Sequence, residues 1–401
     1  MSYAQAGNKR QKVREGRAEM DYFQGIDKVE YNNMATPTDG SSYRYYCSGE
    51  RLHGRTMEEW LKYSVSFSDF KSNGSDSHGK PTVSRPWDDN TNSIDNYKRC
   101  IKAFLDFCLK LGVKYWTAFD TDLVPLTDNW DENRTNWDEI SEYLQEMLQK
   151  THLKILWLAP DLHSHPRYAS GASTSHEAAT YVHAATQIKK CLEMSQRLNA
   201  ENFLIWPYRE GYSAIFQTDL AKELKLFAKL LKTTAEYKDR LSYKCQLQIM
   251  PYVDFGRNYN MSWQHQSWRQ NDVHRYMWDV TSCLYFLKNF NLDRHYKACT
   301  PPGPDMYMAS VYNMLGGVTV TDHFDYSDAK SITLTMKYIV DMQRYASFGS
   351  GFGGRIMTND VPLEECEEYY KKNQVQNESA SSKTCHYELV FQRYLDTCDH
   401  V

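Results

Sequence analysis

Apolar residues along the chain follow two alternating patterns. Short continuous apolar runs, such as KYWTAFD at 114–120 and KILWLAP at 154–160, are typical of strands buried on both faces. Between such runs, apolar positions recur at the spacing of an amphipathic helix, in segments 93–112, 136–151, 175–198, 218–239, 271–292 and 327–347. The first of these segments ends at Gly112, a residue type that often terminates helices. The pattern predicts strands and helices in alternation.

The alternation extends over most of the chain. Further strands are predicted at 64–70, 202–208, 246–254, 296–301, 316–322 and 351–357. With the two runs above they make eight strands alternating with helices, which is the count of a (β/α)8 TIM barrel of the α/β class. We therefore expect three parts: an N-terminal arm and wrapping segment at 1–63, the barrel at 64–360, and a short C-terminal helical tail at 361–401.

Composition and charge narrow the class of protein. The 401 residues carry a net charge of −4, which gives no general attraction to nucleic acid, and we expect no nucleic acid as a partner. No apolar run reaches the length of a membrane span, so no membrane insertion is expected. The basic stretch NKRQKVREGR at 8–17 is interpreted as a solvated arm. Ten cysteines lie singly without a CxxC pair, which favours reduced thiols and a cytoplasmic location.

A TIM barrel places its active site at the carboxyl ends of its strands, so the residues there are the candidates for chemistry. In chain order they are Asp69, Phe119, Asp120, Asp122, Asp161, His163, His165, Arg209, Glu210, Met250, Pro301, Thr319 and Gly353. The acidic and imidazole groups come from the first four strands, whereas the last four contribute a thioether, a proline, a threonine and a glycine. Asp120, Asp122, Arg209 and Glu210 are predicted to form a buried ion network at the barrel mouth.

Two stretches of the sequence partly match cofactor-binding motifs. Asp161, His163 and His165 alternate and would face one way as a metal-binding trio, but Pro166 ends any strand directly afterwards. The GSGFGG stretch at 349–354 contains GxGxxG, yet it follows a predicted helix instead of a strand. We therefore predict no bound metal and no other cofactor.

Several separate segments resemble one known family in order and spacing. They are YFQGIDKVEY (22–31), HGRTMEEWLKYSVSF (53–67), VSRPWDD (83–89), LHSHPRYASGASTS (162–175) and ENFLIWPYREGY (201–212), with weaker agreement through YNMLGG (312–317). These segments are similar to the long-chain class of xylose isomerases. The resemblance implies a barrel that interconverts aldoses and ketoses. In that family a histidine on the second strand helps to open the sugar ring, oriented by an aspartate three residues later. Two divalent ions held by strands five to eight drive a hydride shift.

Matched position by position, this chain departs from the family pattern. The ring-opening histidine falls on Phe119, although its aspartate partner is retained as Asp122. The strand-five Glu-Pro-Lys becomes Met250-Pro251-Tyr252, and the remaining metal-binding positions fall on Pro301, Pro304, Thr319 and Gly353, with Asp325 and Asp328 as remnants of an aspartate pair. Divalent ions of this kind need several hard oxygen ligands, which thioether and proline side chains do not offer. The resemblance therefore implies that no catalytic residue of the family remains.

Part of the family's sugar site is retained. Its two tryptophans match Trp157 and Trp206, with Asp120, Asp122, His165, Arg209 and Glu210 beside them. Our preferred interpretation is an inactive barrel, not an enzyme, that serves as a structural subunit of a larger cytoskeletal or organellar assembly. The 14% aromatic content suits protein partners, and the family implies homodimers or tetramers. Two alternatives stay open: a sugar-binding or sensing protein without turnover, and an enzyme whose chemistry has moved to Asp120, Asp122, His165 and Glu210.

Overall fold

The computed structural model describes residues 22–36, 41–44, 46–52, 54–71, 85–127, 129–251, 274–301, 304–319 and 351–373. By their contacts the residues group into two compact units, Met1–Val320 and Thr321–Val401. The predicted helix at 327–347 and the residues Tyr252, Asp325 and Asp328 lie outside the described residues. The predicted division of the chain at residues 63 and 360 stays a prediction.

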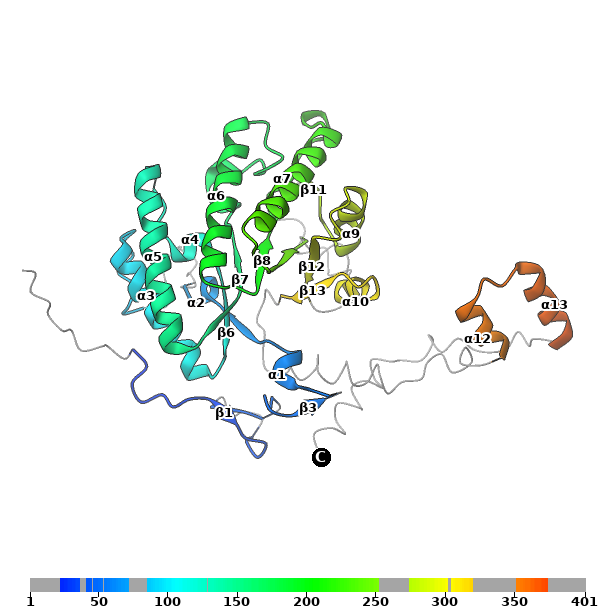
Figure 1. The fold of residues 1–401 in the computed structure, drawn as a ribbon, viewed down its shortest axis with the longest axis horizontal. Coiled ribbons are helices and arrows are strands. Elements are labelled where there is room, and N and C mark those ends of the chain that lie inside the picture. Colours follow the sequence, from blue (N-terminus) through cyan, green and yellow to red (C-terminus); the bar gives the residue numbers. More distant parts are fainter. Residues whose placement is uncertain are drawn as a thin grey trace, which may run out of the picture. The chain divides into compact units, whose positions relative to one another are not determined.

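Seven parallel strands form the central sheet of the first unit (Figure 1). They are β5 (Ser64–Ser66), β6 (Tyr115–Phe119), β7 (Lys154–Ala159), β8 (Asn202–Ile205), β10 (Gln246–Ile249), β12 (Tyr296–Thr300) and β13 (Leu315–Val318). Their order across the sheet is their order along the chain, and each neighbouring pair is parallel. This is the arrangement of a (β/α) barrel, in which each strand leads through a helix to its neighbour. The predicted α/β TIM-barrel class is confirmed.

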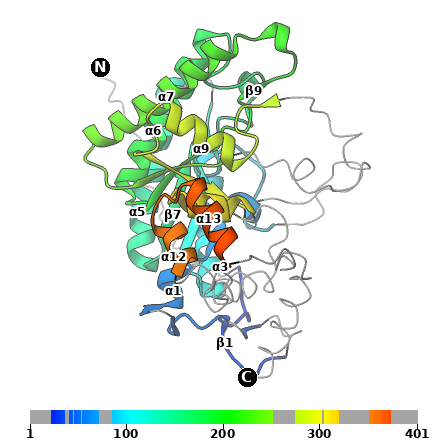
Figure 2. The same ribbon diagram turned by 90° about the vertical axis from the view of Figure 1, so that its right-hand side faces the viewer.

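Helices connect successive strands. They are α2 (Phe67–Lys71), α3 (Ile94–Leu111), α4 (Asp120–Leu123), α5 (Trp130–Thr151), α6 (Ala178–Arg197), α7 (Leu220–Arg240), α9 (Val280–Asn289) and α10 (Pro304–Val311). In Figure 1, α5, α6 and α7 lie side by side along one face of the sheet. Figure 2 shows α9 next to α7, where Phe286 stacks on Phe227. None of the helices in the described ranges has the length and apolar character that crossing a bilayer requires.

The long helices form where the sequence provides both an apolar face and caps. The Ser93 hydroxyl accepts the Asn96 N–H at the start of α3, and Gly112 ends the helix with a left-handed φ of 70°. This confirms the end predicted from Gly112. The Asn129 side chain caps the start of α5 in the same way.

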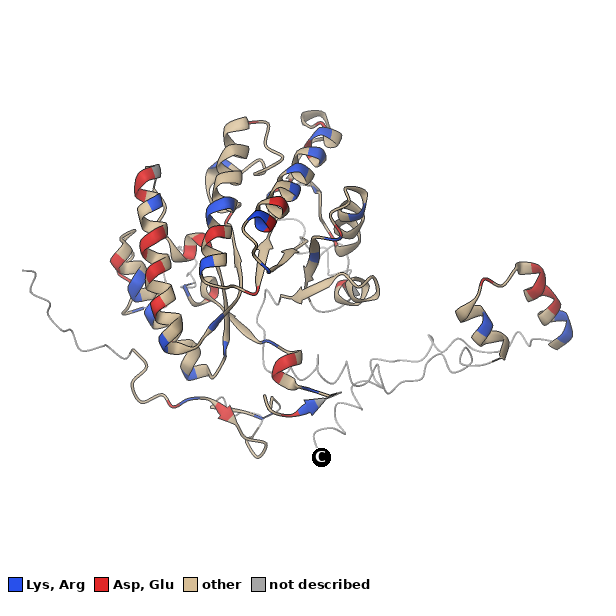
Figure 3. Ribbon diagram, in the orientation of Figure 1, with Lys and Arg blue, Asp and Glu red and all other residues tan. Residues whose placement is uncertain are grey.

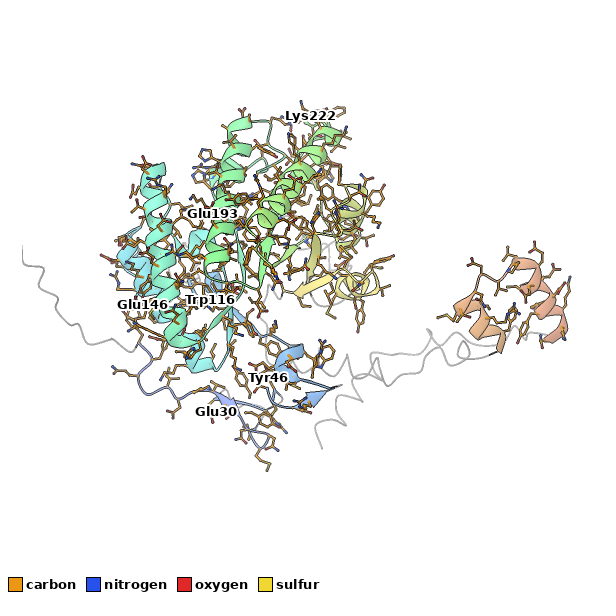
Figure 4. All side chains as sticks on the ribbon, in the orientation of Figure 1. Glu30, Tyr46, Trp116, Glu146, Glu193 and Lys222 are labelled. Carbon is orange, nitrogen blue, oxygen red and sulfur yellow. The ribbon has the colours of Figure 1, made fainter. Side chains whose placement is uncertain are left out.

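The outward faces of the helices are charged and the strand side chains beneath them are buried. Lys, Arg, Asp and Glu are interspersed along α5, α6 and α7 (Figure 3). Figure 4 labels Glu146 on α5, which forms an ion pair with Lys150 at 2.7 Å. It also labels Trp116 of β6, which is fully buried. The helices therefore cover the sheet with their apolar sides and meet solvent with their charged sides.

Short elements precede the barrel. They are β1 (Glu30–Tyr31), β2 (Ser42–Tyr43), β3 (Arg51–Leu52), β4 (Arg55–Thr56) and α1 (Met57–Trp60). The Tyr43 hydroxyl donates to the Leu111 carbonyl at 2.8 Å, and the Val29 N–H donates to the Lys110 carbonyl at 2.8 Å. These bonds fasten the N-terminal segment to the carboxyl end of α3.

The described cysteines are all free, and most of them are buried in the core. The buried ones are Cys100, Cys108, Cys191, Cys245, Cys283 and Cys299, whereas Cys47 and Cys366 are partly exposed. Burial raises the pKa of the Cys100 thiol to about 11 and that of Cys108 to about 12. Such thiols behave as small apolar side chains.

Several predicted elements differ in detail. The strand predicted at 64–70 ends at Ser66, and Phe67–Lys71 form α2 instead. The strand predicted at 351–357 is the helix α12 (Gly351–Thr358) in the second unit, which also contains α13 (Leu363–Asn373). The physical reason is packing between the two helices: Phe352 stacks on Tyr369 at 4.1 Å between ring centroids, and Arg355 pairs with Glu365 at 2.5 Å. A short run without β-branched residues except Ile356 has no strong preference of its own for a strand.

The helix predicted at 271–292 is shorter than its apolar pattern. It begins at Val280, because the Asp279 carboxylate caps it by accepting the Ser282 N–H at 2.6 Å. Ahead of it, β11 (His274–Arg275) pairs in antiparallel fashion with β9 (Gly211–Tyr212). Pairing with another strand therefore overrides the helical pattern at the start of this segment.

Candidate functional site

Strand β6 ends at Phe119 and turns directly into α4, and Asp122 holds this turn. Its Oδ2 accepts hydrogen bonds from the Phe119 N–H at 3.1 Å and from the Ser68 hydroxyl. Burial raises the pKa of Asp122, an effect that the nearby Lys71 ammonium opposes. The aspartate that the family resemblance assigns to orienting a histidine therefore caps the end of β6.

Asp120, the first residue of α4, is enclosed by protein. Its Oδ1 accepts the N–H groups of Thr121 and Asp161, both at 2.8 Å, and its Oδ2 accepts the Gln187 amide of α6 at 2.9 Å. Burial raises the pKa of this carboxyl to about 7, although the hydrogen bonds work in the opposite direction. One side chain thus ties together α4, the loop after β7 and α6.

The loop after β7 brings Asp161 and His163 together. His163 Nδ1 lies 3.0 Å from Asp161 Oδ1, but the atoms are not aligned for a hydrogen bond, and the contact becomes an ion pair only when the imidazole is protonated. Burial lowers the pKa of His163, the Asp161 carboxylate opposes this change, and the Arg209 charge adds to it. Burial works to raise the pKa of Asp161, but His163 and the Ser164 N–H hold it below its usual value. Near pH 7 the site therefore holds a neutral imidazole beside a carboxylate.

Four partly exposed aromatic side chains, Phe119, Trp157, Trp206 and Tyr208, meet at the ends of β6, β7 and β8; we call them the aromatic wall. Ring centroids are 5.7 Å apart for Phe119 and Trp157 and 4.8 Å apart for Trp206 and Tyr208. The His163 ring lies 5.2 Å from that of Phe119 and 4.7 Å from that of Trp206. Apolar side chains of the barrel interior pack against the wall: Ala159, Leu204, Met250 and Cys299.

Glu210 is buried and fastens the loop after β7. Its Oε1 accepts the Ser173 N–H at 2.8 Å and the Ser173 hydroxyl at 2.9 Å. Its Oε2 accepts the Thr174 N–H at 3.1 Å and the Thr174 hydroxyl. A buried carboxylate with this many donors is a fixed structural element of the barrel mouth.

Replacing Gly171 by alanine is expected to lower the free energy of unfolding by about 3 kcal/mol. Gly171 has a φ of +92°, and an added Cβ would lie 2.3 Å from Thr174 Oγ1 and 2.8 Å from Glu210 Oε2. Urea unfolding followed by circular dichroism measures the change. The matched control is Gly25→Ala, because Gly25 has a φ of +76° with nothing within 4 Å of an added Cβ. An equal loss in both variants would contradict the steric part of the argument.

Two other predicted site residues have local roles. Arg209 Nε donates to the His163 carbonyl at 3.3 Å, and its guanidinium lies 5.5 Å from the Tyr208 ring centroid. His165 is exposed and accepts from the Arg167 side chain at 2.9 Å through Nδ1. The predicted ion network therefore does not form as one unit: Asp120, Asp122 and Glu210 each accept their own set of neutral donors.

The described donors at the ends of the later strands do not fit the family's pair of divalent ions. Met250 packs in the apolar cluster, Pro301 offers no side-chain ligand, and the Thr319 hydroxyl lies 2.9 Å from Cys299 Sγ. Gly353 belongs to the second unit, and Pro304 begins α10. Within the described ranges no three His, Cys, Asp or Glu side chains gather into a metal-binding group, which includes the trio considered around Asp161.

Sequence reasoning missed three residues that support the site: Thr121, Gln187 and Tyr208. Of these three, only Gln187 could have been found from the sequence. Its spacing places it on the same face of α6 as the buried residues Ala184, Ile188 and Cys191. A long polar side chain on an apolar face has to find a partner inside the protein. Thr121 and Tyr208 carry no comparable signal in the sequence.

The parallel order of the strands, with helices between neighbours, makes the chain a (β/α) barrel of the TIM class. The chain belongs to the xylose isomerase family. It is 32% identical over 368 residues to a xylose isomerase of Hordeum vulgare, across 86% of this chain and 73% of that protein. It is 30% identical over 367 residues to a xylose isomerase of Caldicellulosiruptor bescii, across 86% of this chain and 80% of that protein.

Two further comparisons concern parts of the chain or its fold. Residues 342–395 match the family model described as the XylA2 C-terminal domain. The solved structure of L-ribulose 3-epimerase aligns with a TM-score of 0.41 at 12% identity, across 77% of this chain and 91% of that chain. A superposition this loose supports no statement about activity.

The prediction that this chain is not an enzyme is wrong. The chain belongs to a family of enzymes, and its relatives from H. vulgare and C. bescii are named xylose isomerase. A place in a larger assembly, protein partners, homodimers or tetramers and a cytoplasmic location all stay predictions.

Proposed function

We propose that this chain is an enzyme that binds a monosaccharide against the aromatic wall and acts on it by proton transfer. The observation that carries the proposal is the wall itself. Its rings converge from three adjacent strands, and each keeps part of its surface open. The wall stands at the carboxyl ends of the strands, which is the end where barrels of this class bind substrates.

Aromatic walls suit sugars because a pyranose ring has both apolar C–H faces and polar edges. The C–H faces pack on aromatic rings, while hydroxyl groups take up hydrogen bonds at the rim. The indole Nε1 of Trp206 is buried and lacks an acceptor among the described residues. An orphaned N–H of this kind costs about 1–3 kcal/mol, and a sugar oxygen would relieve it.

The family relationship supports the choice of substrate class. The relatives named above are xylose isomerases, so aldoses and ketoses are the first compounds to test. Because the described strand ends do not fit the family's pair of ions, the proposal relies on the chain's own titratable groups. The neutral imidazole of His163 beside Asp161 is the group in contact with the wall.

Thermal unfolding with and without sugar tests the binding part of the proposal. D-xylose and D-glucose are expected to raise the midpoint of the wild-type protein, because a ligand that binds only the folded state stabilises it. In Trp206→Leu the sugar-dependent rise is expected to disappear, since the variant removes the ring and its N–H. Product analysis by NMR on the same samples then tests turnover.

The matched control is Trp60→Phe, an aromatic change in α1 before the amino end of β5. It is expected to keep the full sugar-dependent rise. If none of a panel of aldoses and ketoses shifts the wild-type midpoint, or if Trp206→Leu responds like the wild type, the proposal is overturned.

A further inference from the structure

Asp161 is held at every polar atom it has. Its N–H donates to Asp120 at 2.8 Å, and its carbonyl accepts the Gln187 amide at 3.1 Å. Its Oδ2 accepts the Thr121 hydroxyl at 2.9 Å, and its Oδ1 accepts the N–H groups of His163 and Ser164 at 3.1 and 2.9 Å. Asp161 is therefore fixed from α4, α6 and its own loop, as a preorganised site requires.

The His163 ring is held on one side and open on the other. Its Nδ1 faces the Asp161 carboxylate at 3.0 Å, and its faces lie among Phe119, Trp206 and Tyr208. The side chain is 15% exposed, and Nδ1 is buried without a hydrogen bond to a described residue. A carboxylate 3.0 Å from Nδ1 can stabilise an imidazolium, and a partly exposed side chain can meet a substrate, which are two features that general acid–base catalysis uses.

We propose that Asp161 and His163 form a proton-transfer pair that opens the ring of an aldose bound at the aromatic wall, without a metal ion. The inference rests on the proposed function, which supplies the bound sugar. Beyond the proposed function, it names the two residues that transfer the proton and the ring-opening step that they catalyse. The two ends of the step are the cyclic sugar and its open-chain aldehyde.

The step balances with one imidazole. His163 Nε2 takes the proton of the anomeric hydroxyl as the bond between C1 and the ring oxygen breaks. The imidazolium then gives this proton to the ring oxygen, and the open-chain aldehyde is left. Closure from the other face of the aldehyde runs the same transfers in reverse and yields the other anomer. Asp161 stabilises the imidazolium formed in between, and no oxidant, reductant or ion is consumed.

The location of the pair explains why Phe119 can stand where the family resemblance places a ring-opening histidine. The Phe119 ring is 5.2 Å from the His163 ring, so the imidazole reaches the same part of the barrel mouth from the next strand. Thr121, Gln187 and Asp120 are then positioning residues, because they act through Asp161.

Mutarotation of α-D-glucose and α-D-xylose, followed by polarimetry at low buffer concentration, tests the inference. The wild-type protein is expected to accelerate anomer exchange, and His163→Gln to lose about 100-fold or more of that rate. The matched control is His183→Gln, an exposed histidine of α6, which is expected to keep the full rate. Circular dichroism and the melting curve establish that each variant is folded.

A second variant separates catalysis from mere structure. Asp161→Asn keeps most of the shape but removes the charge that opposes the lowering of the His163 pKa. Its pH–rate profile is expected to shift toward lower pH and its maximal rate to fall. A purely structural Asp161 would lower the rate without moving the profile, and that result would overturn the role assigned to it.

The outcomes distinguish this inference from the function on which it rests. If sugars stabilise the wild-type protein through Trp206 but anomer exchange is not accelerated, the proton-transfer pair is refuted and the binding site stands. If exchange is accelerated equally by the wild type and His163→Gln, another group opens the ring and the inference is refuted. If no sugar stabilises the protein, the proposed function fails first.

Discussion

Replacing Glu210 by alanine is expected to lower the free energy of unfolding by about 4 kcal/mol. The carboxylate is the acceptor for two N–H groups and two hydroxyls of Ser173 and Thr174, and all three residues are buried. Without it, these donors lie in the interior with no partner. Each orphaned group costs about 1–3 kcal/mol, part of which water entering the vacated space would recover.

Urea unfolding at pH 7, followed by circular dichroism and tryptophan fluorescence, measures this loss. Glu142→Ala is the matched control, since Glu142 is 72% exposed and its ion pair with Arg197 at 3.4 Å lies on the surface. Surface pairs of this kind contribute about 0–1 kcal/mol, so the control is expected to change little. A loss below about 1 kcal/mol for Glu210→Ala would show that the loop after β7 is held by other contacts.

Replacing Asp120 by asparagine is expected to change how stability depends on pH. The carboxyl has a pKa of about 7 in the folded protein against an ordinary value of 3.8, mainly because it is buried. Between these values the folded state keeps a proton that the unfolded state has released. Stability from this group is therefore fully present below about pH 4 and falls as the pH rises to about 7.

The size of the effect follows from the difference between the two pKa values. It amounts to about 4 kcal/mol between pH 4 and pH 8. Asparagine cannot ionise, so the stability of Asp120→Asn relative to the wild type is expected to rise by that amount over the same interval. The charged and titratable groups near Asp120 are Asp161, Tyr168 and Cys191, and all three remain in the variant.

Urea unfolding at several pH values measures how the free energy of unfolding changes with pH in the wild type and in Asp120→Asn. Asp131→Asn serves as the control, because Asp131 is 83% exposed at the start of α5. It is expected to follow the wild-type slope. Parallel curves for the wild type and Asp120→Asn would mean that the Asp120 carboxyl is ionised throughout and that its hydrogen bonds outweigh its burial.

The barrel could be predicted because the local sequence pattern of each element agrees with the place of that element in the fold. The apolar runs at β6, β7 and β8 are buried on both faces, and Gly112 ends α3 where the apolar pattern ends. The glycine-rich run at 351–357 had no such agreement. This run is helical because it packs on α13, for example through Phe352 on Tyr369. Contacts of this kind cannot be seen in the local sequence pattern.

The sequence predicted which residues lie at the site, but not which of them form hydrogen bonds with one another. The strand-end rule found Asp120, Asp161 and His163, and the alternation of Asp161, His163 and His165 suggested a metal-binding trio. The structure instead joins Asp161 to Thr121 and to Gln187, which lies 26 positions further along the chain. Pairings of this kind depend on how α6 packs on the sheet, and one sequence does not contain that information.

The six buried thiols in the part of the chain that the structure describes can serve as internal reporters of local opening. They are distributed over α3, α6, the residue before β10, α9 and β12, and burial raises the pKa of each of them. A thiol held in this way reacts with an alkylating reagent only when its own element opens. The order in which Cys108, Cys191 and Cys299 are modified therefore ranks the opening free energies of α3, α6 and β12 in the unaltered chain.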